Sequence, residues 1–594
     1  MKAKRAAAKA GGKPSAPRAG SASPGYALAP AGEARPRPWA AFWPGALLVL
    51  ALLVPFLGKA HALDDVTFLL QAQHVLHDPL HPTAFDMVAD GDRIRLSSML
   101  VSGPVMAYLL VPSVLLGGAE WAAHLVPLLL MLVAVLATVA IGLRLGLRTS
   151  EARLAGLLLA ATPVAAAMAT TSMADVPAMA FGALGMERLL CWRDEGHRHQ
   201  AIAAGLGFAL AALARPQMLL IVAVAALALW GAERVARPAW ARWRTWLPLL
   251  LVVAVFFVVS RLTADPSRPR GDIVSATLAR FEFERLHWKV AAFSAYWVLA
   301  LPLAVPWAVA RWRQMPLSPV VWAVVLPGTF LLLGGSDPPM TIAMAPVALL
   351  GMAVLADVLS DAVRRRDRDQ MLLGAWLLLA LPTLAYGHLP AKYLVPSAPA
   401  VALLVARLLR RRDGRLSPGV AWAVVAAGAL LGVLITLADA EFTDVGRRVA
   451  RDLIAPRVRA GERVWYAGAW GSQWYAMQAG AVMLASSKPF PTTGHFIVTS
   501  QYSTGAKLTS TAALDSLDNR RFVSRFGRVM SPGDGAGFYT NWYGYLPWTW
   551  HNGEIESVTL WRVRRTMKRQ VPAAAGPPRP AALPLAPWRN PLGP

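Results

Sequence analysis

Long apolar segments alternate with short polar connections along most of the chain. Runs of about 17–25 apolar residues cross a membrane as helices. Apolar runs of roughly this length or slightly shorter lie at about 39–58, 120–143, 153–170, 173–190, 200–214, 217–231, 245–262, 291–310, 318–334, 340–358, 371–387, 394–409 and 419–438. The pattern predicts an all-α polytopic membrane protein with about 13 transmembrane helices between residues 39 and 439.

Two stretches after the first span do not read as membrane helices. Residues 61–98 are largely polar and predict an outer loop. Residues 99–117 are apolar, but Gly103, Pro104 and Pro112 interrupt them. Because Gly and Pro weaken helices, we interpret residues 99–117 as a re-entrant or surface-lying helix pair.

Arginine clusters occur at every second connection between the spans. Short connections rich in Lys and Arg remain in the cytoplasm. We therefore expect the N-terminus inside, the C-terminus outside, and the remaining connections together on the outer face. The clusters are Arg144/Arg148/Arg153, Arg188/Arg193/Arg198, Arg234/Arg237/Arg242/Arg244, Arg311/Arg313, Arg364/Arg365/Arg366/Arg368 and Arg407/Arg410/Arg411/Arg412/Arg415.

Composition supports a membrane protein and argues against several other classes of protein. Of 594 residues, 56% are hydrophobic and 16% are charged, which is far more apolar than a soluble protein. The net charge of +25 comes from clusters between apolar runs, so nucleic-acid binding is not expected. Cys191 is the single cysteine, which excludes an intrachain disulfide. The chain has no Walker loop, H-E-x-x-H or G-x-G-x-x-G motif, which argues against an ATP-driven pump or a nucleotide-binding enzyme.

The two ends of the chain differ from the membrane part. Residues 1–38 are basic and rich in Ala, Gly and Pro, which predicts a disordered cytoplasmic tail. Residues 440–571 alternate β-like runs such as HFIVTS with the helical piece WGSQWYAMQAG, which predicts a small α/β domain on the outer face. Residues 572–594 are rich in Pro and Ala and predict a second disordered tail.

The candidate chemistry begins with Asp64 and Asp65, which follow the first span directly. One explanation is capping of the amphipathic helix VTFLLQAQHVLHD by an acid. The other is an acidic active site that faces a water-filled cavity at the membrane surface, because ionisable residues near membrane depth usually face a cavity or a partner charge.

Further ionisable residues fall on the predicted outer face. The acids are Asp175 and Asp337, and the cations are Arg215, Arg261, His388 and Lys392. Each has a plainer explanation, such as snorkelling for Arg215, capping for Asp175 and interfacial anchoring for Lys392. The histidines His74, His77 and His81 lack nearby cysteines or a close carboxylate pattern, so no metal ligands are assigned. A divalent cation is left open.

Four short motifs, in this order, resemble a known family. They are L-D-D-V-T-F at 63–68, S-M-A-D-V-P-A-M at 172–179, L-A-R-P-Q at 213–217 and H-L-P-A-K-Y-L-V-P-S-A-P-A at 388–400. Together they look like the GT-C class of integral membrane glycosyltransferases, in particular the branch of dolichyl-phosphate-mannose protein mannosyltransferases and aminoarabinose transferases. The resemblance covers about residues 39–410.

The resemblance implies sugar transfer from a polyprenyl-phosphate donor to a lipid, glycan or protein acceptor, at the outer face of the inner (cytoplasmic) membrane. Asp64 matches the family's catalytic carboxylate, and Asp65 stands where the family usually has Glu, so we expect both to be catalytic. The remaining expected site residues are Arg215, His388, Lys392 and Tyr393 for the donor phosphate, and Asp175 and Asp337 for the acceptor or active-site cavity.

The residues themselves are consistent with that reaction. A sugar on a lipid phosphate carries an activated leaving group, so the enzyme needs a carboxylate to take the acceptor proton and cations to stabilise the departing phosphate. A transporter or lipid flippase for envelope precursors is the alternative. Transporters tend to contain an internal repeat with paired broken helices, and no convincing repeat is present. A scaffold without activity would not explain the clustered outer carboxylates.

Overall fold

The computed structural model describes residues 38–89, 91–99, 102–229, 244–267, 286–333, 338–387, 389–409, 417–487, 489–501, 506, 508, 510–531, 534–541 and 543–567. Apart from Pro38, the predicted terminal tails lie outside these residues. So do two of the expected site residues, Asp337 and His388.

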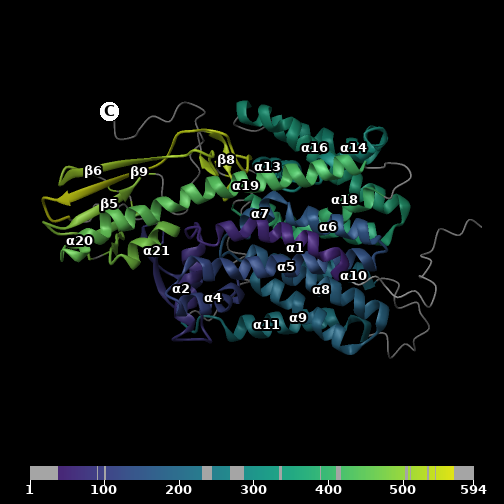
Figure 1. Cartoon of the computed structure of the whole chain (residues 1–594), viewed down its shortest axis with the longest axis horizontal. Coiled ribbons are helices and arrows are strands. Elements are labelled where there is room, and N and C mark those ends of the chain that lie inside the picture. Colours follow the sequence, from purple (N-terminus) through teal and green to yellow (C-terminus); the bar gives the residue numbers. More distant parts are fainter. Residues whose placement is uncertain are drawn as a thin grey trace, which may run out of the picture. The chain divides into compact units, whose positions relative to one another are not determined.

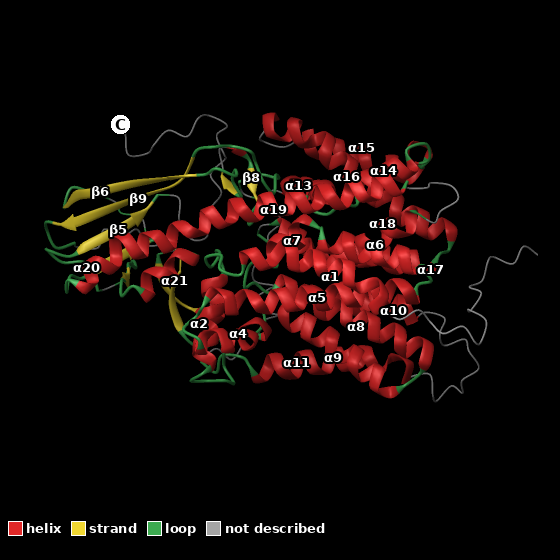
Figure 2. Cartoon of the chain, viewed as in Figure 1, coloured by secondary structure: helices red, strands yellow, loops and turns green. Residues whose placement is uncertain are grey.

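The chain is mostly helical (Figure 2). The helices of its first half are α1 (Trp39–Leu53), α2 (Asp65–Val75), α3 (Leu96–Met99), α4 (Val105–Leu115), α5 (Glu120–Arg144), α6 (Thr149–Ala160), α7 (Pro163–Met168), α8 (Asp175–Glu195), α9 (Arg198–Ala214), α10 (Ile221–Leu229) and α11 (Leu247–Leu262). Those of the second half are α13 (Leu286–Leu299), α14 (Ala304–Arg311), α15 (Pro319–Leu333), α16 (Pro338–Arg365), α17 (Arg368–Leu377), α18 (Ala398–Leu408), α19 (Pro418–Val449), α20 (Ala455–Arg459) and α21 (Gly471–Gln478).

Six helical segments within the described residues are long and apolar enough to cross a membrane. They are Trp39–Phe56, Glu120–Arg144, Arg244–Leu262, Met344–Arg365, Ala391–Leu408 and Pro418–Arg459. The pair α13 and α14, bent by 75°, adds a seventh if it forms one broken span. The chain is thus a multi-pass membrane protein by composition, but the predicted count of about 13 spans is not confirmed.

Helix breaks account for part of the difference in span number, whereas α8 and α9 are unbroken helices that are not among the six. Helical structure lies at every predicted span, but several spans consist of two short helices. The predicted span 153–170 divides into α6 and α7, because Pro163 cannot donate the backbone bond that would continue α6. Similarly, the described part of residues 99–117 contains the last residue of α3 and one helix, α4, instead of the predicted helix pair.

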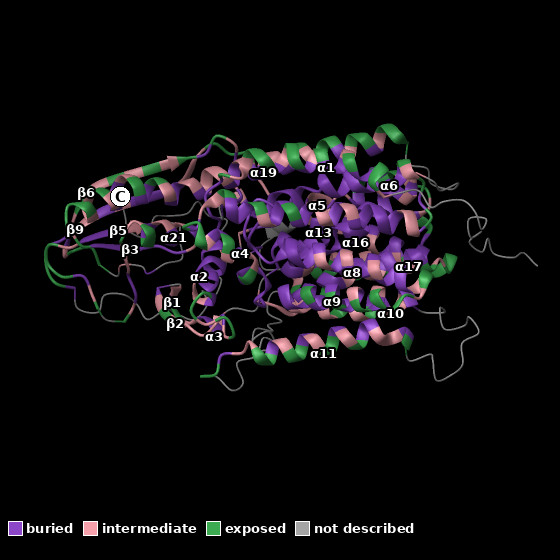
Figure 3. Ribbon diagram, turned by 60° about the horizontal axis from the view of Figure 1, so that its bottom comes forward, coloured by how far each residue is buried: buried purple, intermediate pink, exposed green. Residues whose placement is uncertain are grey.

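Large apolar side chains remain exposed on the outer helices, as the green bands of Figure 3 show for α1, α11 and α19. Trp43 on α1 is 58% exposed, Phe257 on α11 53%, Phe330 on α15 78% and Trp422 on α19 56%. Aromatic surface of this extent is costly in water and suits contact with lipid. The faces turned inward, on α5, α8 and α18 above all, are buried.

A five-stranded sheet forms most of the C-terminal part. Its strands are β3 (Val464–Ala467), β4 (Val482–Met483), β5 (Phe496–Ser500), β6 (Leu514–Val523) and β9 (Glu554–Val563), in the order β4-β3-β5-β9-β6. β3 runs parallel to β4 and β5, whereas β9 is antiparallel to β5 and β6. Short hairpins add β1 (Asp86–Ala89) with β2 (Asp92–Arg95), and β7 (Met530–Ser531) with β8 (Ala536–Gly537).

Helix α19 connects the two parts of the fold (Figure 1). It packs on α6, α7 and α14, continues past residue 440 without a break, and then contacts α21 and β9. Its last buried residues, Val445 and Val449, share a core with Tyr466, Val498 and Leu560 of the sheet. The small sheet region expected from the sequence is therefore present, and one continuous helix ties it to the membrane helices.

Two glycines allow the close approaches that position the site. A Cβ on Gly471, at the start of α21, would lie 2.0 Å from the backbone oxygen of His61. A Cβ on Gly103 would lie 1.7 Å from the backbone oxygen of Leu213, near the end of α9. Neither contact tolerates a side chain, so both glycines fix the segments that carry the candidate residues.

Candidate functional site

Asp64 forms an ion pair with Lys392 across 328 residues of sequence. The Lys392 ammonium donates to Asp64 Oδ2 at 2.6 Å. Asp64 precedes α2, but its side chain makes no capping hydrogen bond to that helix, so capping does not explain Asp64. The Asp64 side chain is 50% exposed, whereas that of Lys392 is 5% exposed. The carboxylate is thus reachable from outside, and its cation lies behind it.

A second ion pair lies close to the first. Arg215 Nη2 donates to Asp175 Oδ2 at 2.7 Å, and both side chains are buried. The Arg215 guanidinium also lies over the ring of Tyr393, 4.9 Å from its centroid. Burial and pairing of this kind exclude snorkelling of Arg215 to an interface. Within the described residues, Asp175 Oδ1 and Arg215 Nε have no hydrogen-bond partner, so the pair retains polar atoms for a further contact.

Both ion pairs meet at the 3₁₀ segment Ala391–Ser397, which carries Lys392 and Tyr393 next to each other. Lys392 Nζ also lies 3.6 Å from Met173 Sδ and 5.7 Å from the centre of the Tyr539 ring. The fold therefore gathers most of the residues singled out in the sequence, namely Asp64, Asp175, Arg215, Lys392 and Tyr393. His388 and Asp337 lie outside the described residues, as stated above.

Asp65 has surroundings quite unlike those of Asp64. It is fully buried. Its Oδ2 accepts the backbone N–H of Ala62 at 2.7 Å, and its Oδ1 accepts that of Ser172 at 2.8 Å. The Asp65 carboxylate therefore joins the turn before α2 to the loop before α8, and it holds the backbone on both sides of the candidate site.

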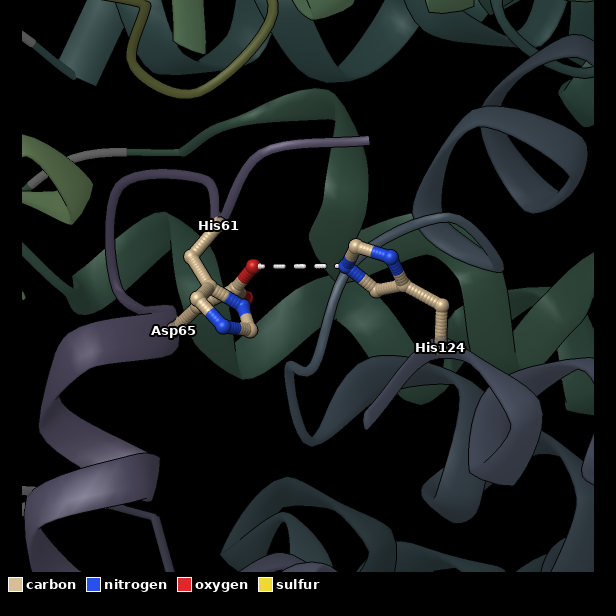
Figure 4. A group of neighbouring side chains, drawn as sticks. All are labelled: His61, Asp65 and His124. Carbon is tan, nitrogen blue, oxygen red and sulfur yellow. Dashed lines mark ion pairs between the residues drawn. The ribbon is translucent and has the colours of Figure 1, made fainter. Parts of the chain in front are cut away.

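Two histidines that the sequence did not single out lie beside Asp65 (Figure 4). The dashed line joins Asp65 Oδ2 to His124 Nε2, at 4.0 Å. His61 precedes α2, His124 lies in α5, and both are buried. Burial and the nearby His124 lower the pKa of His61 from its ordinary value, which favours a neutral ring.

Among the residues that the structure describes, the set His61, Asp65 and His124 is the group of three that could hold a metal ion. The histidines to which the sequence assigned no metal have other contacts: His81 pairs with Asp78 at 3.0 Å, and His74 packs on Phe85 with ring centroids 4.9 Å apart. The spacing of His61 and Asp65 was only a weak sequence signal for a metal site. His124 lies within an apolar run, and no motif around it indicated a ligand.

A buried lysine that the sequence analysis also missed lies near the site. Lys59 Nζ donates to Asp439 of α19 and, at 3.1 Å, to Thr170 Oγ1. The Tyr539 hydroxyl donates to the same Asp439 carboxylate at 2.8 Å. This network fastens the end of the first span to α19 and holds Tyr539 beside Lys392.

Comparisons with known proteins give partial likenesses. No family model and no curated protein sequence matches the chain. Two solved structures of ArnT from Cupriavidus metallidurans are similar over 77% of this chain and 92% of theirs: the undecaprenyl phosphate complex (17% identity, TM-score 0.39) and the apo state (18%, 0.40). The arabinofuranosyltransferase AftD from Mycobacteria is similar over 89% of this chain and 40% of its own (15%, 0.37). At such TM-scores the likeness decides no activity, and the site residues must carry the functional conclusion.

Proposed function

We propose that the protein is a membrane glycosyltransferase that moves a sugar from a polyprenyl-phosphate donor to a lipid, glycan or protein acceptor. One observation carries the proposal: the half-exposed Asp64 carboxylate stands 2.6 Å from the buried Lys392 ammonium. A base open to an acceptor and a cation set behind it are the two groups that this reaction needs.

The proposed step follows from these positions. The acceptor hydroxyl or amine attacks C1 of the sugar and gives its proton to Asp64, and the C1–O bond to phosphate breaks as the polyprenyl phosphate leaves with the bonding electrons. Lys392 and Arg215 bind the phosphate oxygens and stabilise their charge. When the phosphate engages Lys392, the Asp64 carboxylate is released from its ion pair and can accept the proton.

The other site residues support the three that act, Asp64, Lys392 and Arg215. Asp175 pairs with Arg215 and Tyr393 underlies the same guanidinium, so both orient the second cation. Asp65, which the sequence resemblance placed beside Asp64 in catalysis, takes a positioning role in this proposal because its oxygens are buried on backbone N–H groups. The reaction balances without a redox or nucleotide cofactor.

The site belongs on the outer face of the inner membrane in this proposal. Arginine-rich connections such as that at Arg366 are then cytoplasmic, and Gly461 in the sheet part is outside. Reporters fused at these two positions test the orientation directly. A cytoplasmic signal at Gly461 would remove the outer-face assignment.

The decisive experiment for the function uses the purified protein and undecaprenyl-phosphate-linked sugars of different kinds. Release of undecaprenyl phosphate together with sugar transfer supports a glycosyltransferase. Movement of the intact lipid-linked sugar across a vesicle membrane, without cleavage, would instead establish a flippase. In cells, lipid-linked saccharides should accumulate when the protein is removed, and a specific envelope glycan, lipid or glycoprotein should lose its sugar.

A further inference from the structure

The hydrogen bonds of His61 and His124 fix which ring nitrogen of each carries a proton. His61 Nε2 lies 3.0 Å from the backbone oxygen of Gly118, and His124 Nδ1 lies 3.0 Å from that of Leu57. A carbonyl oxygen can only accept, so each of these nitrogens is the N–H donor. The opposite nitrogens, His61 Nδ1 and His124 Nε2, are buried without a hydrogen-bond partner in the described part of the chain. When the rings are neutral, each of these two nitrogens carries a lone pair that can bind a metal ion.

We propose that these two nitrogens and the carboxylate of Asp65 bind a divalent transition-metal ion, for which Zn²⁺ is the best match. The three ligand atoms all lie within 4.8 Å of one another. Bonds of about 2.0–2.2 Å to Zn²⁺ require a modest contraction of that triangle, which rotation of the imidazoles supplies. Two imidazoles and one carboxylate suit zinc, whereas magnesium and calcium prefer oxygen ligands.

The surroundings of the three ligands are those of a prepared metal site. Metal-binding histidines usually donate their other ring N–H to a backbone carbonyl or a carboxylate, which sets the tautomer. His61 and His124 both do so. Asp65 is likewise held by the N–H groups of Ala62 and Ser172, and each oxygen keeps a further lone pair. All three side chains are oriented before any ion arrives.

An ion pair between a protonated His124 and Asp65 is a simpler explanation of this group, but it explains fewer of the observed contacts. The separation of 4.0 Å between His124 Nε2 and Asp65 Oδ2 exceeds the distance of a hydrogen bond, about 2.7–3.2 Å. It also leaves His61 Nδ1 buried without a partner. A metal ion satisfies both nitrogens at once.

One of the three ligands borders a pocket, and the three together connect separate segments of the fold. His61 lines this pocket with Thr443, Ser500 and Glu556, which brings polar space up to that ligand. The three ligands join the segment after the first span, the start of α2, and α5. Asp64 lies between two of them in sequence, so a bound ion would fix the backbone that carries it. The metal proposal stands whether or not the protein transfers sugars.

The test uses the full-length protein, stripped with a chelator and then reloaded with Zn²⁺ or Co²⁺ alone. After removal of free metal, the wild type should retain about one ion per chain, and Co²⁺ should show the visible absorption of a low-coordinate nitrogen-ligated site. His61→Gln and His124→Gln should retain less than about a tenth of an ion. The matched control is His77→Gln, since His77 is an exposed histidine at the end of α2 and should leave retention unchanged.

Thermal unfolding separates metal loss from misfolding. In chelator, wild type and both site variants should unfold at similar temperatures, and added Zn²⁺ should raise the unfolding temperature of the wild type and of His77→Gln only. Wild-type protein that retains no ion and shows no Co²⁺ absorption overturns the proposal without reference to any variant. Equal retention by wild type and by the two site variants overturns it as well.

Discussion

Two clusters of buried charge show how differently the fold treats ion pairs. At Arg311, the guanidinium reaches Asp357 at 2.5 Å and Asp361 at 3.1 Å. Trp307 and Gln370 donate to the same two acids, at 3.0 and 2.9 Å. The side chains of this Arg311 cluster are at most 4% exposed. At Lys392, by contrast, the paired acid Asp64 is 50% exposed.

The difference separates an ion pair that holds helices together from one that can accept a ligand. The Arg311 cluster joins α14, α16 and α17 and shields its charges from water. A buried pair of this kind costs desolvation that only its partners offset. Asp64 leaves one side open, so a substrate can compete for Lys392 without unfolding the site. The predictions below test this contrast.

The largest loss of stability is expected from a substitution in the Arg311 cluster. Arg311→Met removes the buried cation that Asp357 and Asp361 share and leaves them with the more exposed Arg364 and Arg365, which should destabilise the protein by about 3–5 kcal/mol. Denaturant unfolding in detergent measures the change. Arg313→Met is the matched control, because Arg313 is exposed, and should cost less than about 0.5 kcal/mol. Equal effects of the two substitutions would show that the cluster does not hold the helices.

Arg215 shares features of both clusters, since it is buried yet belongs to the proposed donor site. Arg215→Met should destabilise the protein by about 3 kcal/mol or more, because the buried carboxylate of Asp175 loses its cation. The double variant Arg215→Met/Asp175→Leu removes both charges and should recover most of that stability while undecaprenyl phosphate binding stays weak. A double variant with normal binding would make the pair purely structural.

Lys392 should affect binding more than stability, because its partner is half exposed. Lys392→Gln removes the charged hydrogen-bond donor that we propose for the phosphate, worth about 1.5–3 kcal/mol, so KM for the sugar donor should rise roughly 10- to 100-fold. Lys392→Arg keeps the charge and should be milder. Steady-state kinetics of the two variants side by side provide the measurement. An unchanged KM in Lys392→Gln would disconnect Lys392 from the donor.

The smallest effect on stability is expected from Asp265, a buried acid outside the membrane helices. Burial opposes its ionisation, but hydrogen bonds from Arg95, Ser267 and Ser97 outweigh it and hold the pKa of Asp265 below its ordinary value. A lowered acid pKa stabilises the folded state above the unfolded pKa of about 3.9, and this stability is lost as the pH falls below it. Wild type should therefore lose more stability on acidification than Asp265→Asn. Parallel acid unfolding curves would contradict this assignment.

The sequence indicated the residues of the candidate site better than the environment of each residue. Motifs far apart in the chain singled out Asp64, Asp175, Arg215, Lys392 and Tyr393, and these residues lie together in the fold, while their roles stay predictions. The different environments of Asp64 and Asp65 were not predictable, since they depend on the Ser172 backbone more than a hundred positions away.

Other features that the sequence did not predict have physical causes as well. His124 looked like one polar residue in the span of α5, because its partners, the Leu57 carbonyl and Asp65, meet it only in the folded chain. The strand β6 was missed because its sequence LDSLDNRRFV is polar on an exposed edge of the sheet. Several predicted spans were continuous in hydropathy but broken in structure, as at Pro163.

The most direct test of the account is Asp64→Asn, assayed for sugar transfer from an undecaprenyl-phosphate-linked donor alongside thermal unfolding in detergent. Asn keeps the size of the side chain but cannot take the acceptor proton. The account predicts only a small loss of stability, because the amide oxygen can still accept from Lys392, and a fall in turnover by about 10² to 10⁴. Asp78→Asn, just beyond the other end of α2, should retain wild-type turnover. A stable Asp64→Asn protein with near-normal turnover would contradict it.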